Sequence, residues 1–249
     1  MKVLTVDKGN TNCKFALFKD GEIVECGVEN NIEGLEALIK KFGPDRVSFS
    51  SVVPDWSDKI KRILNLLRFP YKELSSQVKL PFKLLVDEPQ RVGPDRIALA
   101  CGARYLGFSR ALIVDAGTAL TVDILSEVGF EGGAIFPGPE LLIKALSTGT
   151  AMIGDIEISD SIPELPGKNT RDAVVAGIFR GFIGAVNSLI LQTMERLDIG
   201  SLRGKEMILI TGGYSDWVMD HLDPEIEKVS RLEKNLVFYG LYSILGISD

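Results

Sequence analysis

The chain has 249 residues, a net charge of −6 and three widely spaced cysteines. This length allows one large domain or two modest ones with a well-buried core. The acidic balance argues against nucleic acid or an anionic membrane as a partner, because both require clustered Lys and Arg. Three cysteines without a CxxC pair favour neither a disulfide framework nor a zinc site. A single histidine, His221, nearly excludes a histidine-based catalytic triad or metal cluster.

The N-terminal residues, MKVLTVDKGN, lead directly into an expected strand and contain no apolar signal segment. Acidic residues and glycines interrupt the best apolar runs, so we expect no membrane span. We therefore expect a cytoplasmic protein whose cysteines are buried, unreactive thiols.

Hydrophobic periodicity predicts a similar order of elements in the two halves of the chain. In the first half we expect strands at 2–6, 13–18, 22–28 and 47–53, with helices at 32–42 and 55–67. In the second half we expect strands at 111–114, 120–125, 129–136, 207–211 and 226–230. The helices expected there lie at 140–147, 171–197, 215–222 and 232–245.

The local sequence repeats as well, since LTVDKGNTNCKFALF at 4–18 matches LIVDAGTALTVDIL at 112–125. This duplication predicts an α/β fold of two domains, at 1–109 and 110–249, each with a mixed sheet flanked by helices. We expect the two domains to face each other across a cleft.

Each half places an aspartate at the end of a strand, followed by a glycine and then a threonine. Glycine lets the backbone approach a ligand closely, while the following amides and the threonine hydroxyl can donate to phosphate oxygens. Asp7 and Asp115 are suited to hold a hydrated Mg²⁺ that shields the phosphate charge. The alternative is an ordinary hairpin turn without a ligand.

Two further glycine-rich turns follow expected strands, GGAIFPG at 132–138 and TGG at 211–213. TGG directly precedes an expected helix and suits contact with an adenosine phosphate. A purely structural role in bending the chain is equally compatible with this pattern.

The tetrapeptide GPDR occurs twice, at 43–46 and 93–96. The first copy ends a helix, because Gly43 follows Lys40 and Lys41 in the last turn and Pro44 lies immediately beyond. The second copy opens a helix with Pro94 and Asp95 in its first turn. Asp95 can accept a proton from a substrate hydroxyl there, or it can simply cap the helix.

Six motifs together resemble the type III pantothenate kinases, in the order in which that family carries them. They are DKGNTNCK at 7–14, VGPDR at 92–96, DAGTALTVD at 115–123, GGAIFPG at 132–138, GKNT at 167–170 and TGG at 211–213. The resemblance covers essentially the whole chain. It implies duplicated actin-like (ribonuclease H-like) domains, as in acetate kinase, sugar kinases, Hsp70 and actin.

The implied activity is ATP-dependent phosphorylation of pantothenate to 4′-phosphopantothenate, the first step towards coenzyme A. The family also implies a homodimer and a requirement for Mg²⁺ and a monovalent cation, K⁺ or NH₄⁺. By position, Asp95 resembles the general base, Gly93, Pro94 and Arg96 resemble substrate-binding residues, and Thr170 resembles a further substrate contact.

The implied nucleotide and cation contacts come from the two aspartate turns. Asp115 is similar to the monovalent-cation ligand, and Thr118 resembles a nucleotide contact. The ATP phosphate loop resembles the run Asp7, Lys8, Gly9, Asn10, Thr11, Asn12, Cys13 and Lys14.

The sequence departs from the family at two positions, where Val86 replaces the usual tyrosine and Glu88 the usual asparagine. These changes concern substrate affinity more than reaction type. The alternatives are another small-molecule kinase of the same superfold or a nucleotide-binding regulator without turnover.

Overall fold

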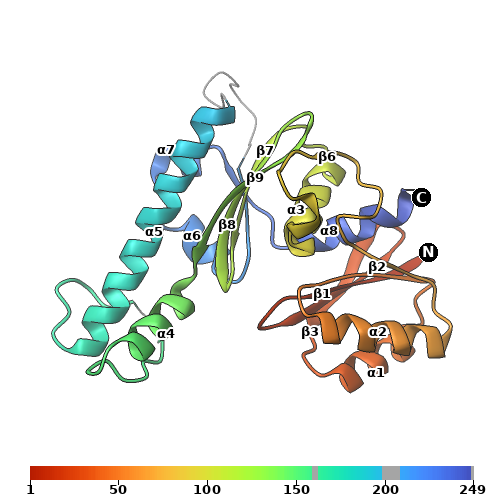
Figure 1. The fold of residues 1–249 in the computed structure, drawn as a ribbon, viewed down its shortest axis with the longest axis horizontal. Coiled ribbons are helices and arrows are strands. Elements are labelled where there is room, and N and C mark those ends of the chain that lie inside the picture. The colour runs from red at the N-terminus through yellow and green to blue at the C-terminus, as the bar shows by residue number, and fades with distance from the viewer. Residues whose placement is uncertain (159–161, 198–207, 248–249) are drawn as a thin grey trace. The chain divides into compact units, whose positions relative to one another are not determined.

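The computed structural model describes residues 1–158, 162–197 and 208–247. The chain forms two compact units (Figure 1). Unit 1 comprises Met1–Ser109, Leu125–Gly132 and Asn235–Asp249, and unit 2 comprises Arg110–Ile124 and Gly133–Lys234. The units therefore part after residue 109, where a domain boundary was expected, but two later segments return to unit 1. The expected cleft between the domains stays a prediction.

Unit 1 is built on a five-stranded sheet in the order β3-β2-β1-β4-β5. β1 pairs antiparallel with β2 and parallel with β4, so the sheet is mixed as expected. The strands of this sheet are β1 (Lys2–Lys8), β2 (Cys13–Lys19), β3 (Glu22–Val28), β4 (Arg46–Ser51) and β5 (Tyr71–Glu73). The other elements are α1 (Ile32–Phe42), α2 (Pro54–Leu67), β6 (Lys83–Leu84), η1 (Pro89–Arg91), α3 (Pro94–Tyr105), α8 (Leu236–Ser243) and η3 (Ile244–Gly246).

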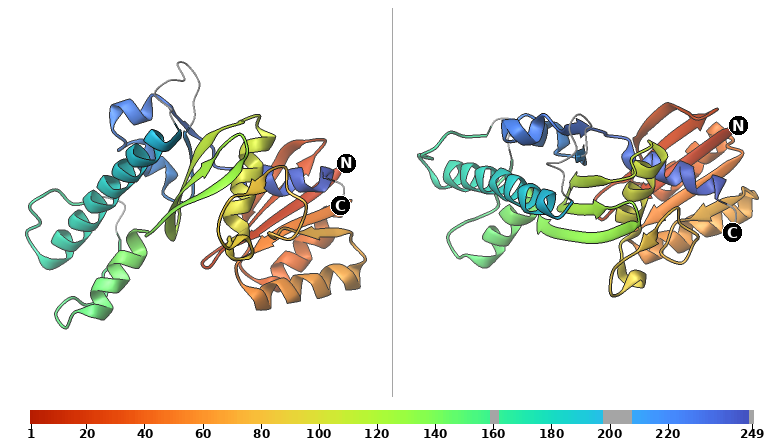
Figure 2. Two further views of the ribbon diagram at one scale, coloured as in Figure 1. Left: turned by 45° about the horizontal axis from the view of Figure 1, so that its top comes forward. Right: turned by 90° about the horizontal axis from the view of Figure 1, so that it is seen from above.

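Alternating side chains bury both faces of this sheet. On one face Leu4 and Val6 pack in a core cluster with Leu35 of α1 and Ile60 of α2. On the other face the Phe18 ring stacks on Tyr242 of α8, with ring centroids 4.5 Å apart. Figure 2 shows α1 and α2 on one face and α3 and α8 on the other.

Unit 2 contains most of a six-stranded sheet in the order β11-β10-β7-β8-β9-β6. Read as β9-β8-β7-β10-β11, this order repeats β3-β2-β1-β4-β5, and β7, β10 and β11 are parallel like β1, β4 and β5. The expected duplication is therefore present in the sheet order. The elements are β7 (Ala111–Ala116), β8 (Ala119–Leu125), β9 (Gly129–Pro137), α4 (Pro139–Gly149), α5 (Thr170–Leu197), β10 (Ile208–Thr211), α6 (Ser215–Met219), α7 (Pro224–Glu227) and β11 (Ser230–Leu232).

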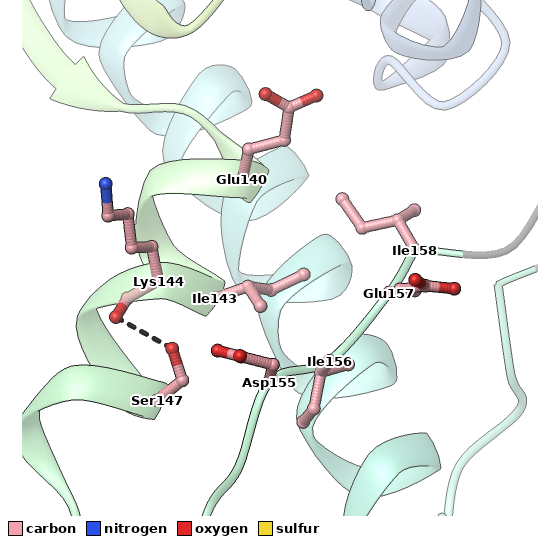
Figure 3. A pocket seen from close by; sticks show the side chains of 8 residues that line it. All are labelled: Glu140, Ile143, Lys144, Ser147, Asp155, Ile156, Glu157 and Ile158. Atoms are coloured by element: carbon pink, nitrogen blue, oxygen red, sulfur yellow. Dashed lines mark hydrogen bonds between the residues drawn. The ribbon is translucent and has the colours of Figure 1, made fainter.

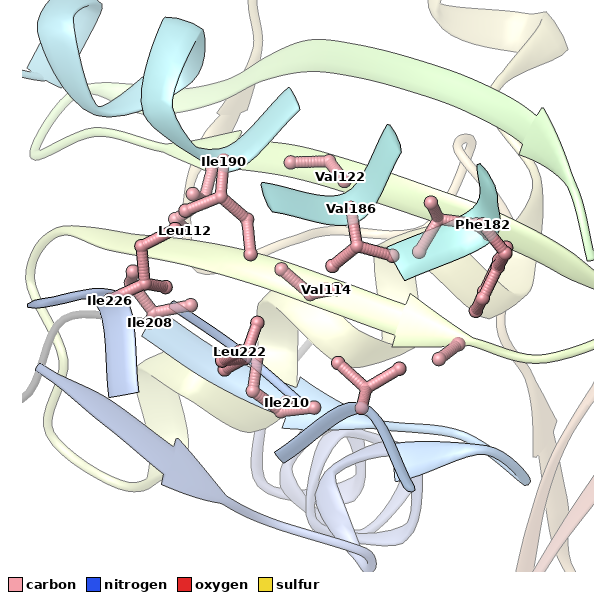
Figure 4. Packing of buried hydrophobic residues seen from close by; sticks show 13 residues of the cluster. Leu112, Val114, Val122, Phe182, Val186, Ile190, Ile208, Ile210, Leu222 and Ile226 are labelled. Carbon is pink, nitrogen blue, oxygen red and sulfur yellow. The ribbon is translucent and has the colours of Figure 1, made fainter. Parts of the chain in front are cut away.

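The core of unit 2 lies between α5 and its sheet. Phe182, Val186 and Ile190 are spaced four residues apart on α5 and are fully buried. Figure 4 shows these side chains over Val114 and Val122 of the sheet.

Three local expectations need correction. The strand expected at 226–230 is instead the short helix α7 followed by β11. Val53 rather than Asp55 occupies the N-cap of α2, because Pro54 already fits the first helical position. The last helix begins at Leu236 instead of residue 232, since Ser230–Leu232 pairs with β10.

One helix in the described part of the chain, Thr170–Glu195 of α5, is long and apolar enough to cross a membrane, with a mean hydropathy of 1.8. The expectation of no membrane span stays a prediction. The observation rests on length and composition alone, and a helix that packs in a protein core meets the same criterion.

Candidate active site

The first aspartate turn lies at the carboxyl end of two parallel strands in unit 1. Asp7 on β1 is the register partner of Ser50 on β4. The Ser50 hydroxyl donates to Asp7 Oδ1 at 2.7 Å. Sequence reasoning missed Ser50, although the serines that end the apolar run VSFSS were a signal that this strand end is polar.

The Asp7 carboxylate is electrostatically strained. Burial raises the pKa of Asp7 from 3.8 to about 6, even though the Ser50 hydrogen bond and the charges of Lys14 and Lys8 lower it. The negative charge of Asp95 raises the pKa of Asp7 further. Asp7 and Asp95 therefore lie close enough to repel each other. The fold of unit 1 brings the end of β1 and the start of α3 together.

The expected phosphate loop is a closed turn braced from the side. The Gly9 amide donates to the Asn12 carbonyl at 3.0 Å. Asn30, which sequence reasoning missed, donates to Asn12 Oδ1 at 3.3 Å and accepts from the Cys13 amide at 2.7 Å. The side chains of Asn10, Thr11 and Asn12 are exposed in this turn.

Two members of the expected loop differ in what they present. The Cys13 side chain is buried in the apolar core, and burial raises the pKa of its thiol to about 12. Only its backbone can contact a ligand without disturbing that core. Lys14 is paired with Asp7 across the β1–β2 ladder and keeps a cationic side chain next to the carboxylate.

The second GPDR copy begins α3, as expected. Gly93 is the N-cap and Pro94 occupies the first helical position. The Asp95 Oδ1 atom accepts from the Arg96 amide at 2.9 Å. A Cβ at residue 93 would collide with Asp95 Oδ1, so a larger residue there would displace this carboxylate. The first copy is a helix end, because Gly43 is left-handed with φ 51° and its amide donates to Ile39 at 3.0 Å.

Arg96 is held by an aromatic ring that the sequence did not identify. Its guanidinium lies over Phe130 of β9, 5.3 Å from the ring centroid, and the Phe130 side chain is fully buried. Two residues further along β9, Gly132 lies against the half-buried Val86. Val86 thus occupies an apolar contact beside the strand that orients Arg96.

The second aspartate turn lies at the matching strand ends in unit 2. Asp115 on β7 is the register partner of Thr211 on β10, because these strands are parallel. Gly212 has φ 97°, and a Cβ there would collide with Asp115 Oδ1 and the Ala116 backbone. The Gly138 amide donates to the Thr118 carbonyl at 3.0 Å. The turns that follow β7, β9 and β10 therefore converge at one edge of the sheet.

Thr170 lies elsewhere in unit 2, as the first residue of α5 and at the rim of an apolar groove of about 690 Å³. Gly177 and Gly181 of the same helix also line this groove. Asn169 caps the helix, accepting from the Asp172 amide at 2.9 Å.

No cluster of three or more His, Cys, Asp or Glu side chains occurs among the described residues in an arrangement that holds a metal ion. The aspartates at the strand ends therefore fit a cation that takes most of its ligands from phosphate oxygens and water, as Mg²⁺ commonly does.

The repeated sheet order and the paired aspartate turns are those of the actin-like fold. The structure superposes on a ROK family glucokinase from Streptomyces griseus in complex with glucose and AMPPNP, with a TM-score of 0.56, 12% identity and 98% of each chain covered. It also superposes on a Campylobacter jejuni protein proposed to be a Baf family transcriptional activator, with a TM-score of 0.60 and 24% identity over 98% of this chain and 97% of that one. At these identities the similarity shows the fold alone.

Sequence comparison is more specific. The family model for type III pantothenate kinase matches residues 3–192, and the chain belongs to this family. A type III pantothenate kinase from Phocaeicola vulgatus is 29% identical over 99% of this chain and 98% of its own length. Another from Chlorobaculum parvum is 30% identical over 99% of this chain and 95% of its own.

The chain is therefore an enzyme that phosphorylates pantothenate in coenzyme A biosynthesis, with ATP as the phosphoryl donor. The family and activity predicted from the six motifs are confirmed.

Proposed function

We propose that Asp95 is the general base that receives the proton of the pantothenate hydroxyl during phosphoryl transfer. The observation that carries this proposal is the electrostatic coupling of Asp95 to Asp7 at the strand end of unit 1. A phosphoryl acceptor bound beside Asp95 would then lie near the loop proposed to bind phosphate. Phosphoryl transfer depends mainly on positioning and charge stabilisation, so one well-placed carboxylate suffices to orient the hydroxyl.

The substrate contacts proposed for pantothenate are Gly93, Pro94, Arg96 and Thr170. Arg96 is suited to the pantothenate carboxylate, because a guanidinium binds a carboxylate through two parallel hydrogen bonds. Its position over the Phe130 ring limits the orientations of the guanidinium before substrate arrives.

The nucleotide contacts proposed in unit 1 are the turn residues Lys8, Gly9, Asn10, Thr11 and Asn12 together with the Cys13 backbone and Lys14. In unit 2 the proposed contact is Thr118. Exposed amide and hydroxyl groups at Asn10 and Thr11 are of the type that donates to phosphate oxygens.

The cations implied by the family fit the carboxylates at the strand ends. Asp7 is buried beside a second negative charge, an environment that a Mg²⁺ ion would stabilise. Bound there, the ion would supply charge neutralisation for the phosphates. Asp115 lies against the Ala116 and Gly212 backbone, and its carboxylate oxygens can coordinate K⁺ or accept hydrogen bonds from NH₄⁺.

A homodimer is proposed for the assembly, through the apolar groove of unit 2. At Gly177 and Gly181 a Cβ would meet no atom within 4 Å, so this face of α5 has room for a second helix. A cytoplasmic location stays a prediction.

Substitution of Asp95 by Asn tests the proposed base. We expect kcat with pantothenate, ATP, Mg²⁺ and K⁺ to fall on the order of 100-fold or more, because an amide cannot accept the proton. A coupled assay of ADP formation measures this loss. Asp58→Asn on α2 is the matched control and should keep full activity.

An Asp95→Asn enzyme with a kcat within twofold of the unsubstituted protein would exclude Asp95 as the base. Turnover with other hydroxyl acceptors but not with pantothenate would instead reassign the substrate.

A further inference from the structure

The three turns at the nucleotide edge of unit 2 are joined in a ring of hydrogen bonds. The Gly138 amide, after β9, donates to the Thr118 carbonyl after β7 at 3.0 Å. The Tyr214 amide, after β10, donates to the Ala116 carbonyl at 2.8 Å. The Tyr214 hydroxyl closes the ring by donating to Glu140 Oε1 at 3.2 Å.

The Tyr214 ring is fixed from the side of α5. Its centroid lies 6.1 Å from Phe179 and 6.4 Å from Phe182, and both pairs meet edge to face. Burial and the neighbouring Glu140 charge raise the pKa of the Tyr214 phenol to about 12. The hydroxyl therefore stays protonated and remains a donor at any physiological pH.

Glu140 also borders a neighbouring hollow, but its carboxylate does not face the other acidic residues there (Figure 3). This hollow of about 600 Å³ lies between α4 and residues 155–158. Figure 3 shows the Glu140 carboxylate turned away from Asp155 and Glu157. Glu140 lies in the first turn of α4, and its carboxylate accepts the hydrogen bond from the Tyr214 hydroxyl.

We propose that Tyr214 is a positioning residue for the nucleotide, acting through Glu140 to hold the turns after β7, β9 and β10 in one arrangement. The proposal rests on the proposed nucleotide contact at Thr118. Backbone groups in these turns can bind ATP well only when their relative positions are fixed beforehand, because ordering them on binding weakens affinity.

The test measures ATP binding in the absence of pantothenate, by calorimetry, alongside steady-state kinetics. Tyr214→Phe keeps the ring packing and the backbone donor and removes only the hydroxyl. We expect a 3–10-fold weaker ATP affinity and a similar rise in KM for ATP, with kcat and KM for pantothenate within twofold.

Glu140→Ala should reproduce this effect, and the double variant should be no worse than either single one, because both remove the same bond. Glu140→Gln keeps an acceptor oxygen and should restore most of the affinity. Tyr71→Phe in unit 1 is the matched control and should leave ATP affinity unchanged.

If the unsubstituted protein binds ATP but Tyr214→Phe binds it equally well, the positioning role of Tyr214 is overturned while the proposed function stands. Additive losses in the double variant would also overturn it, since the two residues would then act separately. If the unsubstituted protein binds no ATP, both the proposed nucleotide contact at Thr118 and the positioning role of Tyr214 are wrong. Equal thermal unfolding midpoints for all variants establish that folding is not what changed.

Discussion

At the scale of single residues, the site contains a carboxylate whose surroundings disfavour its ionised form when no ligand is bound. Asp7 is buried, carries a raised pKa and faces the charge of Asp95. Such an arrangement costs folding stability and becomes favourable when a cation or a substrate proton compensates the charge. Ser50 limits the cost by donating to the same carboxylate.

Asp7→Asn should therefore stabilise the ligand-free protein by about 3 kcal/mol at pH 7.5, while abolishing efficient phosphorylation. Since the folded state holds its proton up to about pH 6 and the unfolded state only to about 3.8, the stability of the unsubstituted protein falls as pH rises between these values. Urea unfolding across about pH 3.5–7.5, a range that brackets both pKa values, measures the difference.

As the pH falls below 3.8 the carboxyl becomes protonated in both states, so the advantage of Asp7→Asn should shrink towards zero. An advantage of the same size at low and neutral pH would show that packing rather than charge is responsible. Asp58→Asn again serves as the control and should show no such pH dependence.

The sequence identified the two aspartate turns and Asp95 because each stands at a strand end or helix start that periodicity predicts. It did not identify Ser50, Asn30, Phe130 or Tyr214. Their partners lie on other elements, and such contacts depend on sheet register and helix packing rather than on local sequence.

At the scale of elements, α5 shows how a polar residue determines where a helix begins. Asn169 accepts from the Asp172 amide at 2.9 Å and donates through its side-chain amide to the Asp172 carboxylate at 2.7 Å. This reciprocal pair satisfies backbone donors that would otherwise lack a partner in the first turn.

Asn169→Ala should destabilise unit 2 by about 1 kcal/mol, because alanine leaves the first-turn amides to water alone. Thermal or urea unfolding measures the loss. Asn169→Ser keeps an acceptor oxygen without placing a second negative charge beside Asp172, and should retain most of the stability. If both variants unfold like the unsubstituted protein, the cap contributes nothing to stability.

Elements with strong periodicity, such as 32–42 and 171–197, match α1 and α5 closely. The segments whose secondary structure was predicted wrongly are short, and their conformation depends on pairing with other elements. At 226–230 the apolar Ile226 turned inward on a helix instead of a strand, and only Ser230–Leu232 joined the sheet.

At the scale of the whole molecule, duplication was predictable because the strand, turn and strand wording occurs twice in the sequence. The homodimer was expected from the family resemblance, but the groove proposed as its interface was not predictable, since it is made by residues between 136 and 182 that come together only in the fold.

Gly181→Leu should weaken dimerisation at least tenfold, because a leucine side chain would fill the groove that a second helix needs. Light scattering over a dilution series measures the change. Gly184→Leu, on the same helix but outside the groove lining, is the matched control. A fully dimeric Gly181→Leu protein, or a monomeric unsubstituted one, would exclude this groove as the interface.

The last helix has a consequence for how the chain is made. α8 packs on α3 at two glycines, Gly102 and Gly240, where any larger residue would strike the opposite backbone. Because α8 follows unit 2 in the sequence, the ribosome synthesises it only after all of unit 2. The N-terminal part of unit 1, which includes α3, therefore cannot complete its packing until the end of translation. A premature stop codon or a bulky fusion near the carboxyl terminus would thus disrupt the packing of unit 1, which carries Asp95.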